Sequence, residues 1–197
     1  MFNVIKDISG NLLSHPSKRY SFRNTDTIDR IVVHQTDSPD KGSFSPYYTA
    51  NYHVNTNDWA GIGYHYFITD DGSAYQTNKD DVVSYHASGF NNRSLAVAIT
   101  GDHTCSASEN NYDVIAKEKY NALVFVLAKI SNRYDIPSES IIGHTETGSP
   151  KSCPNLNLDQ LRSDVKKKRI FLWIAKGIIV LCLMLLLGYS MKKINKY

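Results

Sequence analysis

Short apolar runs between polar segments predict several buried strands. Tyr64 to Ile68 and Ser73 to Gln76 flank Asp70-Asp71-Gly72, a pattern typical of a β-hairpin. Other runs are rich in β-branched or small apolar residues, as buried strands are. These runs are Ile31 to Val33, which ends at His34, Leu95 to Thr100, and Ile141 to Gly143, which ends at His144.

Three segments carry helix signals. Ser45-Pro46 offers an N-cap followed by proline at the first helical position, and residues 116–134 place Tyr120, Leu123, Val124, Leu127 and Ile130 on one face. Asn157 with Gln160 resembles a capping box, and Leu156 with Leu161 forms its hydrophobic staple. Strands therefore alternate with helices. This alternation predicts an α/β protein with a mixed central β-sheet packed by helices.

The last helix leads into a long apolar run. Residues 170–191 contain one charged side chain, Lys176, with Trp173 and Tyr189 near the two ends. A bilayer core needs about 20 apolar residues in a helix, so this run predicts a C-terminal transmembrane helix and a single-pass membrane location. The lipid bilayer is then a partner. The charges that flank the run do not settle on which side of the membrane residues 1–165 lie.

Charge divides the chain in two. Residues 166–197 hold eight Lys/Arg and no Asp/Glu, which leaves 14 Lys/Arg against 19 Asp/Glu in residues 1–165. An acidic globular part argues against a nucleic-acid partner. We therefore divide the chain into an N-terminal extension (1–27), a catalytic domain (28–165), and a basic flank with the transmembrane helix (about 170–191) and a short basic tail (166–197).

Three residues are candidate metal ligands. His34 and His144 each end a predicted strand, and Cys153 follows in a loop. Two imidazoles and a thiolate suit zinc and leave a fourth position open. Taken singly, each residue has an ordinary alternative: a hydrogen-bonded histidine, or a cysteine that is a small buried apolar group.

Four sequence blocks follow one another along the chain: VVHQTDSP, GIGYHYFITDDGSAYQT, SYHASGFNNRSLAVAITGD and GHTETGSPKSCP. Together they resemble the zinc-dependent N-acetylmuramoyl-L-alanine amidases of the type-2 amidase family, which includes phage lysozyme amidases and animal peptidoglycan recognition proteins. The resemblance covers about residues 28–163. It implies a mixed β-sheet packed by helices, with zinc in a groove, and peptidoglycan or muropeptides as partners.

The resemblance also implies residue roles. The zinc ligands fall on His34, His144 and Cys153, the catalytic tyrosine on Tyr64, and the catalytic lysine on Lys151. Residues of the substrate groove fall on His86, Asn91 and Asn92. The implied reaction is hydrolysis of the amide bond between N-acetylmuramic acid and L-alanine. Lys151 stabilises the oxyanion, and Tyr64 either holds the attacking water or passes a proton to the leaving amine.

Two other functions remain open. Some relatives recognise peptidoglycan without cutting it, which makes a non-catalytic binding module the main alternative. In a third hypothesis Cys153 is a nucleophile with His144 as its base, as in thiol hydrolases. Only the zinc amidase needs bound metal for turnover.

Overall fold

The computed structural model describes residues 4–37, 45–101, 115–150 and 152–194, with the side chains of the last helix described to Ile178 and at Met184. Its centre is a six-stranded mixed sheet in the order β1-β5-β4-β7-β3-β8. Within this sheet, among the described residues, β4 and β5 form the one antiparallel pair, as the predicted hairpin. The strands are β1 (Ile5–Asp7), β5 (Ala74–Gln76), β4 (Tyr66–Ile68), β7 (Ser94–Ile99), β3 (Arg30–Gln35) and β8 (Ile141–Gly143).

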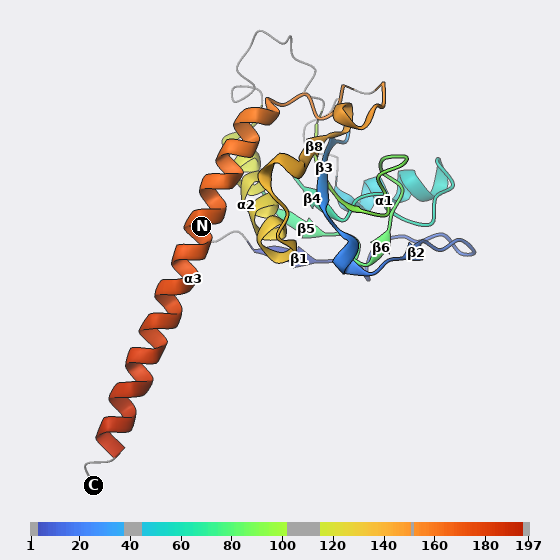
Figure 1. The fold of residues 1–197 in the computed structure, drawn as a ribbon. Coiled ribbons are helices and arrows are strands. Elements are labelled where there is room, and N and C mark those ends of the chain that lie inside the picture. Colours follow the sequence, from blue (N-terminus) through green and yellow to red (C-terminus); the bar gives the residue numbers. More distant parts are fainter. Residues whose placement is uncertain (1–3, 38–44, 102–114, 151, 195–197) are drawn as a thin grey trace.

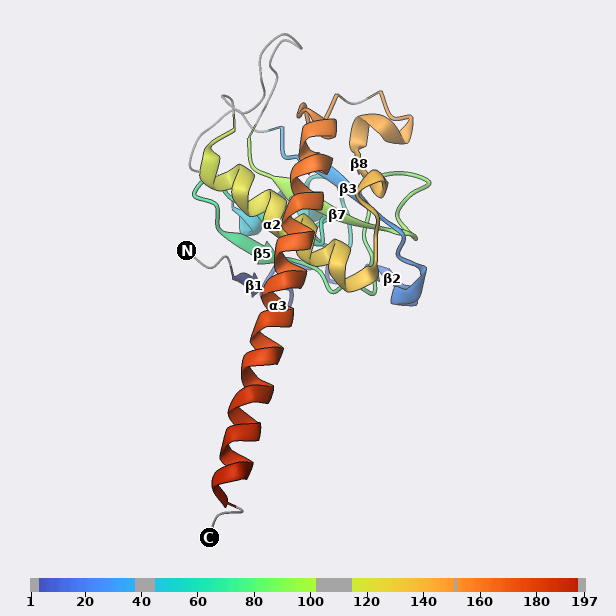
Figure 2. The same cartoon turned by 60° about the vertical axis from the view of Figure 1, so that its left-hand side comes forward.

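Helices cover both faces of this sheet (Figure 1). On one face lie α2 (Lys117–Tyr134) and α3 (Leu158–Ile194), which cross and contact each other, and the C-terminal part of α3 extends beyond the sheet (Figures 1 and 2). On the other face lies α1 (Pro46–Asn55). The prediction of an α/β fold with a mixed sheet packed by helices is confirmed. A separate two-stranded ribbon joins β2 (Ser21–Phe22) to β6 (Val82–Val83).

Alternation along the central strands divides their side chains between the two faces. Ile31 and Val33 of β3 belong to the main core with Leu95, Val97 and Ile99 of β7, beneath α2 and α3. Side chains one position along point the other way, because strand residues alternate between faces. Ala98 accordingly packs with Ala50 of α1 in a second, smaller core. His34 shares this second face.

The helix ends follow the predicted local chemistry. The Ser45 hydroxyl accepts a hydrogen bond from the backbone of Tyr48 at 3.2 Å, with Pro46 at the start of α1. At α3, the Asn157 side chain accepts from the backbone of Gln160 at 3.0 Å, and Leu156 and Leu161 both pack in the main core. The capping box is only half formed, because the Gln160 side chain donates to Asp164 instead.

The described residues also include the short 3-10 helices η1 (Thr25–Thr27), η3 (Ser138–Ser140) and η4 (His144–Thr147). The last of these follows β8 directly. Near the N-terminus, β1 pairs in parallel with β5, so residues that the sequence left without a role extend the sheet by one strand.

The predicted transmembrane helix is wrong. In the part of the chain that the structure describes, none of the helices combines the length and the apolar character that crossing a bilayer requires. The run 170–191 is not a separate helix but the continuation of α3, whose first turns are rich in charge and pack on the domain; within the run, Leu172 still contacts the main core. The single-pass membrane location and the lipid bilayer partner, which rested on this helix, are therefore not supported either.

Candidate metal centre and active site

His34 and His144 are brought together by the register of two parallel strands. β3 pairs with β8 so that Val33 lies opposite Gly143. The next residue in each segment is a histidine, His34 within β3 and His144 directly after β8, and the two rings lie 4.6 Å apart between centroids. His34 is only 2% exposed. Because β3 and β8 are neighbours in the sheet, two histidines far apart in the sequence lie side by side.

Cys153 reaches the same place from the loop before α3. Its Sγ accepts a hydrogen bond from the backbone N–H of Gln35 at 3.1 Å, so the loop is attached to the end of β3. Its carbonyl accepts from the backbone N–H of Thr145 at 2.9 Å, which ties the loop to η4 as well. One ligand atom each of His34, His144 and Cys153 lies within 4.8 Å of the others.

The three side chains fit a zinc ion. Around a tetrahedral zinc with two nitrogens and a sulfur, ligand atoms stand roughly 3.3–3.8 Å apart, so small side-chain rotations would close this set. A histidine ligand must also be neutral. Burial, with a smaller contribution from neighbouring His144, holds the pKa of His34 well below its ordinary value. The donor set and its protonation therefore both suit zinc.

Tyr64 stands beside this trio. Its ring centroid is 5.3 Å from that of His34 and 5.4 Å from that of His53. Its carbonyl accepts hydrogen bonds from Thr77 Oγ1 and Asn78 Nδ2, both at 2.8 Å, so the backbone here is fixed from the next strand. Burial raises the pKa of Tyr64 above its ordinary value, which keeps the phenol protonated at neutral pH. The predicted catalytic lysine, Lys151, lies outside the described residues.

The residues predicted to line the substrate groove take different positions. His86 is 9% exposed and lies behind His34, with 3.2 Å between His34 Nε2 and His86 Nδ1. Asn91 Oδ1 accepts from the backbone N–H groups of His86 and Ala87 at 3.1 and 2.9 Å, so its side chain organises the loop. Asn92 is exposed. Contact of these residues with substrate stays a prediction.

His65, which the resemblance does not make a ligand, belongs to a separate buried network. Its Nδ1 accepts from the backbone of Ala96 at 3.1 Å, and its Nε2 lies 2.8 Å from Arg23 Nη2. Burial, followed by the nearby Arg23 charge, lowers the pKa of His65 to about 4. A neutral His65 is thus held away from the trio.

Sequence reasoning missed several supports of the site. Ser94 contacts His86 Nε2 at 3.1 Å. Glu146 accepts from the backbone N–H of Gly143 at 2.8 Å, and Arg162 of α3 pairs with that carboxylate at 2.6 Å. One signal was available for Ser94: it alternates with Ala96 and Ala98, which places it on the face of His34. No comparable pattern pointed to Glu146.

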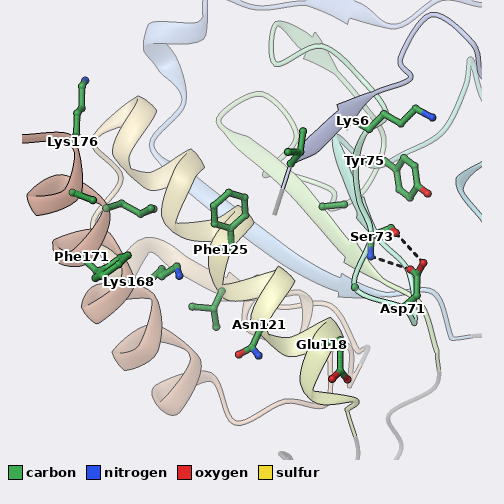
Figure 3. A pocket seen from close by; sticks show the side chains of 16 residues that line it. Lys6, Asp71, Ser73, Tyr75, Glu118, Asn121, Phe125, Lys168, Phe171 and Lys176 are labelled. Atoms are coloured by element: carbon green, nitrogen blue, oxygen red, sulfur yellow. Dashed lines mark hydrogen bonds between the residues drawn. The ribbon is translucent and has the colours of Figure 1, made fainter. Parts of the chain in front are cut away.

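A pocket of about 1320 Å³ lies elsewhere, between α2, α3 and the β1–β5 edge of the sheet. Figure 3 shows Lys168 and Phe171 of α3 on one side of it, Phe125 of α2 at its base, and Tyr75 of β5 across from them. None of the predicted site residues that the structure describes lines this pocket. The candidate site is therefore the metal trio and its surroundings on the α1 face.

Comparisons with known proteins identify the family of this chain. The family model described as N-acetylmuramoyl-L-alanine amidase matches residues 24–156. Peptidoglycan-recognition protein SC2 of Drosophila simulans is 29% identical over 108 residues, 54% of this chain and 54% of that protein. The endolysin of Enterobacteria phage K11 is 29% identical over 102 residues, 52% of this chain and 64% of that protein. The matched part of the chain thus spans between about half and two thirds of these relatives.

A solved structure shares the fold. The endolysin N-acetylmuramoyl-L-alanine amidase LysCS from Clostridium intestinale superposes with a TM-score of 0.66 at 22% identity, covering 83% of this chain and 95% of that one. At this identity the likeness concerns the fold. The family model, by contrast, matches well over half of the chain and includes the segments of His34, His144 and Cys153. The chain belongs to the type-2 N-acetylmuramoyl-L-alanine amidase family.

Proposed function

We propose that this domain is a zinc-dependent amidase that hydrolyses the bond between N-acetylmuramic acid and L-alanine in peptidoglycan. The observation that carries the proposal is the convergence of His34, His144 and Cys153, whose ligand atoms lie within 4.8 Å of one another. Family membership supports hydrolysis of a peptidoglycan amide, and the donor set supports zinc.

The three ligands would hold zinc at the end of β3. Zinc, when bound, supplies a Lewis acid that polarises an amide carbonyl and makes a water molecule more acidic. The chain supplies the rest. Tyr64 is a protonated phenol whose ring centroid lies 5.3 Å from that of His34, and its proposed role is to donate a hydrogen bond to a reacting oxygen or a proton to the leaving amine. Lys151, two residues before Cys153, is the proposed cation for the developing oxyanion.

Cys153 distinguishes the amidase from a binding module. A module that only recognises peptidoglycan has no need of a thiolate ligand, whereas here the Gln35 N–H donates to Sγ at 3.1 Å and so stabilises a thiolate. His34 distinguishes it from a thiol hydrolase. In that mechanism a Cys153 and His144 pair suffices, and the buried, neutral His34 has no task.

The test uses the full chain and purified peptidoglycan. We would measure bound zinc, then identify released products by mass spectrometry with and without a chelator. Free stem peptides that begin with L-alanine, lost on chelation and restored by zinc, are expected. Cys153→Ala should abolish both zinc binding and release, whereas Ser152→Ala, a change at the exposed neighbouring residue, should affect neither.

Two results would overturn the proposal. Full zinc occupancy without released peptide would make the protein a binding module. Release that survives complete removal of metal but is lost in Cys153→Ala would instead make Cys153 the nucleophile.

A further inference from the structure

A buried chain of hydrogen bonds runs from His34 back into the body of the protein. His34 Nε2 lies 3.2 Å from His86 Nδ1, and His86 Nε2 lies 3.1 Å from Ser94 Oγ. The Ser94 hydroxyl lies 2.7 Å from the carbonyl oxygen of Phe90. His34, His86 and Ser94 are 2%, 9% and 0% exposed, so their hydrogen bonds form within the protein.

The donor and acceptor of each hydrogen bond follow from the final bond of the chain, between Ser94 and Phe90. A carbonyl oxygen only accepts, so the Ser94 hydroxyl donates its single proton to Phe90. Ser94 Oγ must then accept from His86, which places the His86 proton on Nε2. A neutral imidazole has one donor and one acceptor nitrogen, so His86 Nδ1 is an acceptor and His34 Nε2 is the donor. The lone pair of His34 therefore lies on Nδ1.

We propose that His86 and Ser94 are positioning residues that hold His34 in the Nε2–H tautomer and so present its Nδ1 lone pair to the metal. This inference rests on the proposed metal site and deepens it. Metal-bound histidines commonly donate their second ring N–H to a partner, which fixes both tautomer and ring orientation. Here the partner is an imidazole, and its own orientation is fixed by a serine and a backbone carbonyl.

The loop that carries His86 is itself anchored. Asn91 Oδ1 accepts from the backbone N–H of His86 at 3.1 Å, and Arg23 donates to the carbonyls of Asn91 and Ser94, both at 2.7 Å. The His34 and His86 rings meet edge to face at 90°, with centroids 5.3 Å apart. The imidazole partner therefore has little freedom to turn away from His34, and the proton order is built into the fold.

The proposal predicts a distant effect of Ser94. In Ser94→Ala, His86 loses the acceptor for its Nε2–H, so both rings can exchange tautomers and His34 presents Nδ1 only part of the time. Loss of such an outer partner typically weakens metal binding by 10-fold or more. Ser94→Thr keeps the hydroxyl and should bind metal as the unchanged protein does.

The chain offers a matched control for a buried serine. Ser131 of α2 is fully buried, and among the described residues its hydroxyl has no hydrogen-bond partner. Ser131→Ala therefore removes a buried hydroxyl with no link to the site. Thermal midpoints of the metal-free variants show whether Ser94→Ala has changed the fold rather than the tautomer.

The test has two independent readouts. Imidazole ¹⁵N NMR of the metal-free full chain should show His34 protonated on Nε2, with this signal pattern lost in Ser94→Ala. Competition with a chelator should show zinc and cobalt affinity reduced about 10-fold or more in Ser94→Ala, and unchanged within about 2-fold in Ser94→Thr and Ser131→Ala.

Protonation of His34 on Nδ1 in the unchanged protein would overturn the proposal, as would equal metal affinity in Ser94→Ala. If the chain bound no metal at all, the proposed function would fail, and with it the role assigned to the tautomer. Normal zinc binding with His34 protonated on Nδ1 would overturn this inference and leave the proposed function standing.

Discussion

Gly63 packs closely against Tyr85 and Trp59, next to Tyr64 of the candidate site, and replacing it with alanine should force these segments apart. A Cβ there would come within 2.5 Å of the carbonyl oxygen of Tyr85 and 2.9 Å of the Trp59 ring. The first distance falls about 0.9 Å short of the 3.4 Å at which ordinary contacts begin, and the obstacle is backbone. Tyr64 follows Gly63 and His86 follows Tyr85, so a shift of the backbone at either position would also move a residue of the candidate site.

The cost can be worked from the bonds that must yield. Overpacking costs about 1–3 kcal/mol. The Gly63 N–H donates to His53 Nδ1 at 2.9 Å, and the Ser84 hydroxyl donates to the Gly63 carbonyl at 2.8 Å; straining these two bonds adds about 1 kcal/mol each. The free energy of unfolding should therefore fall by about 3–5 kcal/mol. For a chain of this size the thermal midpoint should drop by about 6–20 °C.

Gly61→Ala is the matched control. Its Cβ would meet Tyr20 at 3.5 Å, an ordinary contact, and neither glycine has a left-handed backbone. Both variants gain the same small benefit from a stiffer unfolded chain, so their difference isolates the steric effect. Guanidinium unfolding measures it directly. Free energies of unfolding within about 1 kcal/mol of each other would refute the reasoning.

Two further predictions concern buried charge and buried histidine. Asp80 is 7% exposed, and its carboxylate accepts hydrogen bonds from the Tyr66 and Tyr134 hydroxyls at 2.7 and 2.5 Å. Asp80→Ala should therefore lower the free energy of unfolding, measured in urea, by about 3–5 kcal/mol. The control Asp81→Ala, at an exposed position, should lower it by under about 0.5 kcal/mol. Burial lowers the pKa of His53 to about 4, below the ordinary 6.5. Between these two values the unfolded chain binds more protons than the folded one, so the free energy of unfolding should fall as the pH decreases from 6.5 to 4. The loss from this group should reach about 3 kcal/mol. His53→Asn keeps an acceptor for the Gly63 N–H and should flatten that part of the stability curve; an unchanged slope would contradict the assignment.

Local sequence patterns were enough to predict the central strands and the helix starts. The run Ile31 to Val33 is β-branched and buried, and Ser45-Pro46 starts α1, because each signal acts through its own few residues. β1 was missed for the same reason. Ile5 to Asp7 is short and half polar, and only pairing with β5 makes it a strand.

The residue types and strand ends made His34, His144 and Cys153 candidate ligands, but only the family resemblance joined them into one site. Spacing along the chain does not reveal that β3 and β8 are neighbours, since more than 100 residues separate them. The contact of His86 with His34 was beyond reach for another reason. Its hydrogen bond to His34 depends on ring orientation within a packed interior, and residue type does not specify orientation. The apolar run 170–191 was misjudged because hydropathy ignores its continuity with a helix that packs on the domain.

The two faces of the central sheet carry different residues, because side chains alternate along each strand: most of the core lies on one face and the candidate site on the other. Ile31 and Val33 of β3 face the large core under α2 and α3, whereas His34, one position further, faces the small core beside α1. On β7 the same alternation sets Leu95 and Val97 against Ser94 and Ala98. Small side chains on the second face lie beside three imidazoles: His34 on β3, His144 directly after β8, and His86 on the loop that follows β6. It follows that changes on the first face should alter only the free energy of unfolding, whereas changes beside His34 on the second should also alter the proposed metal binding.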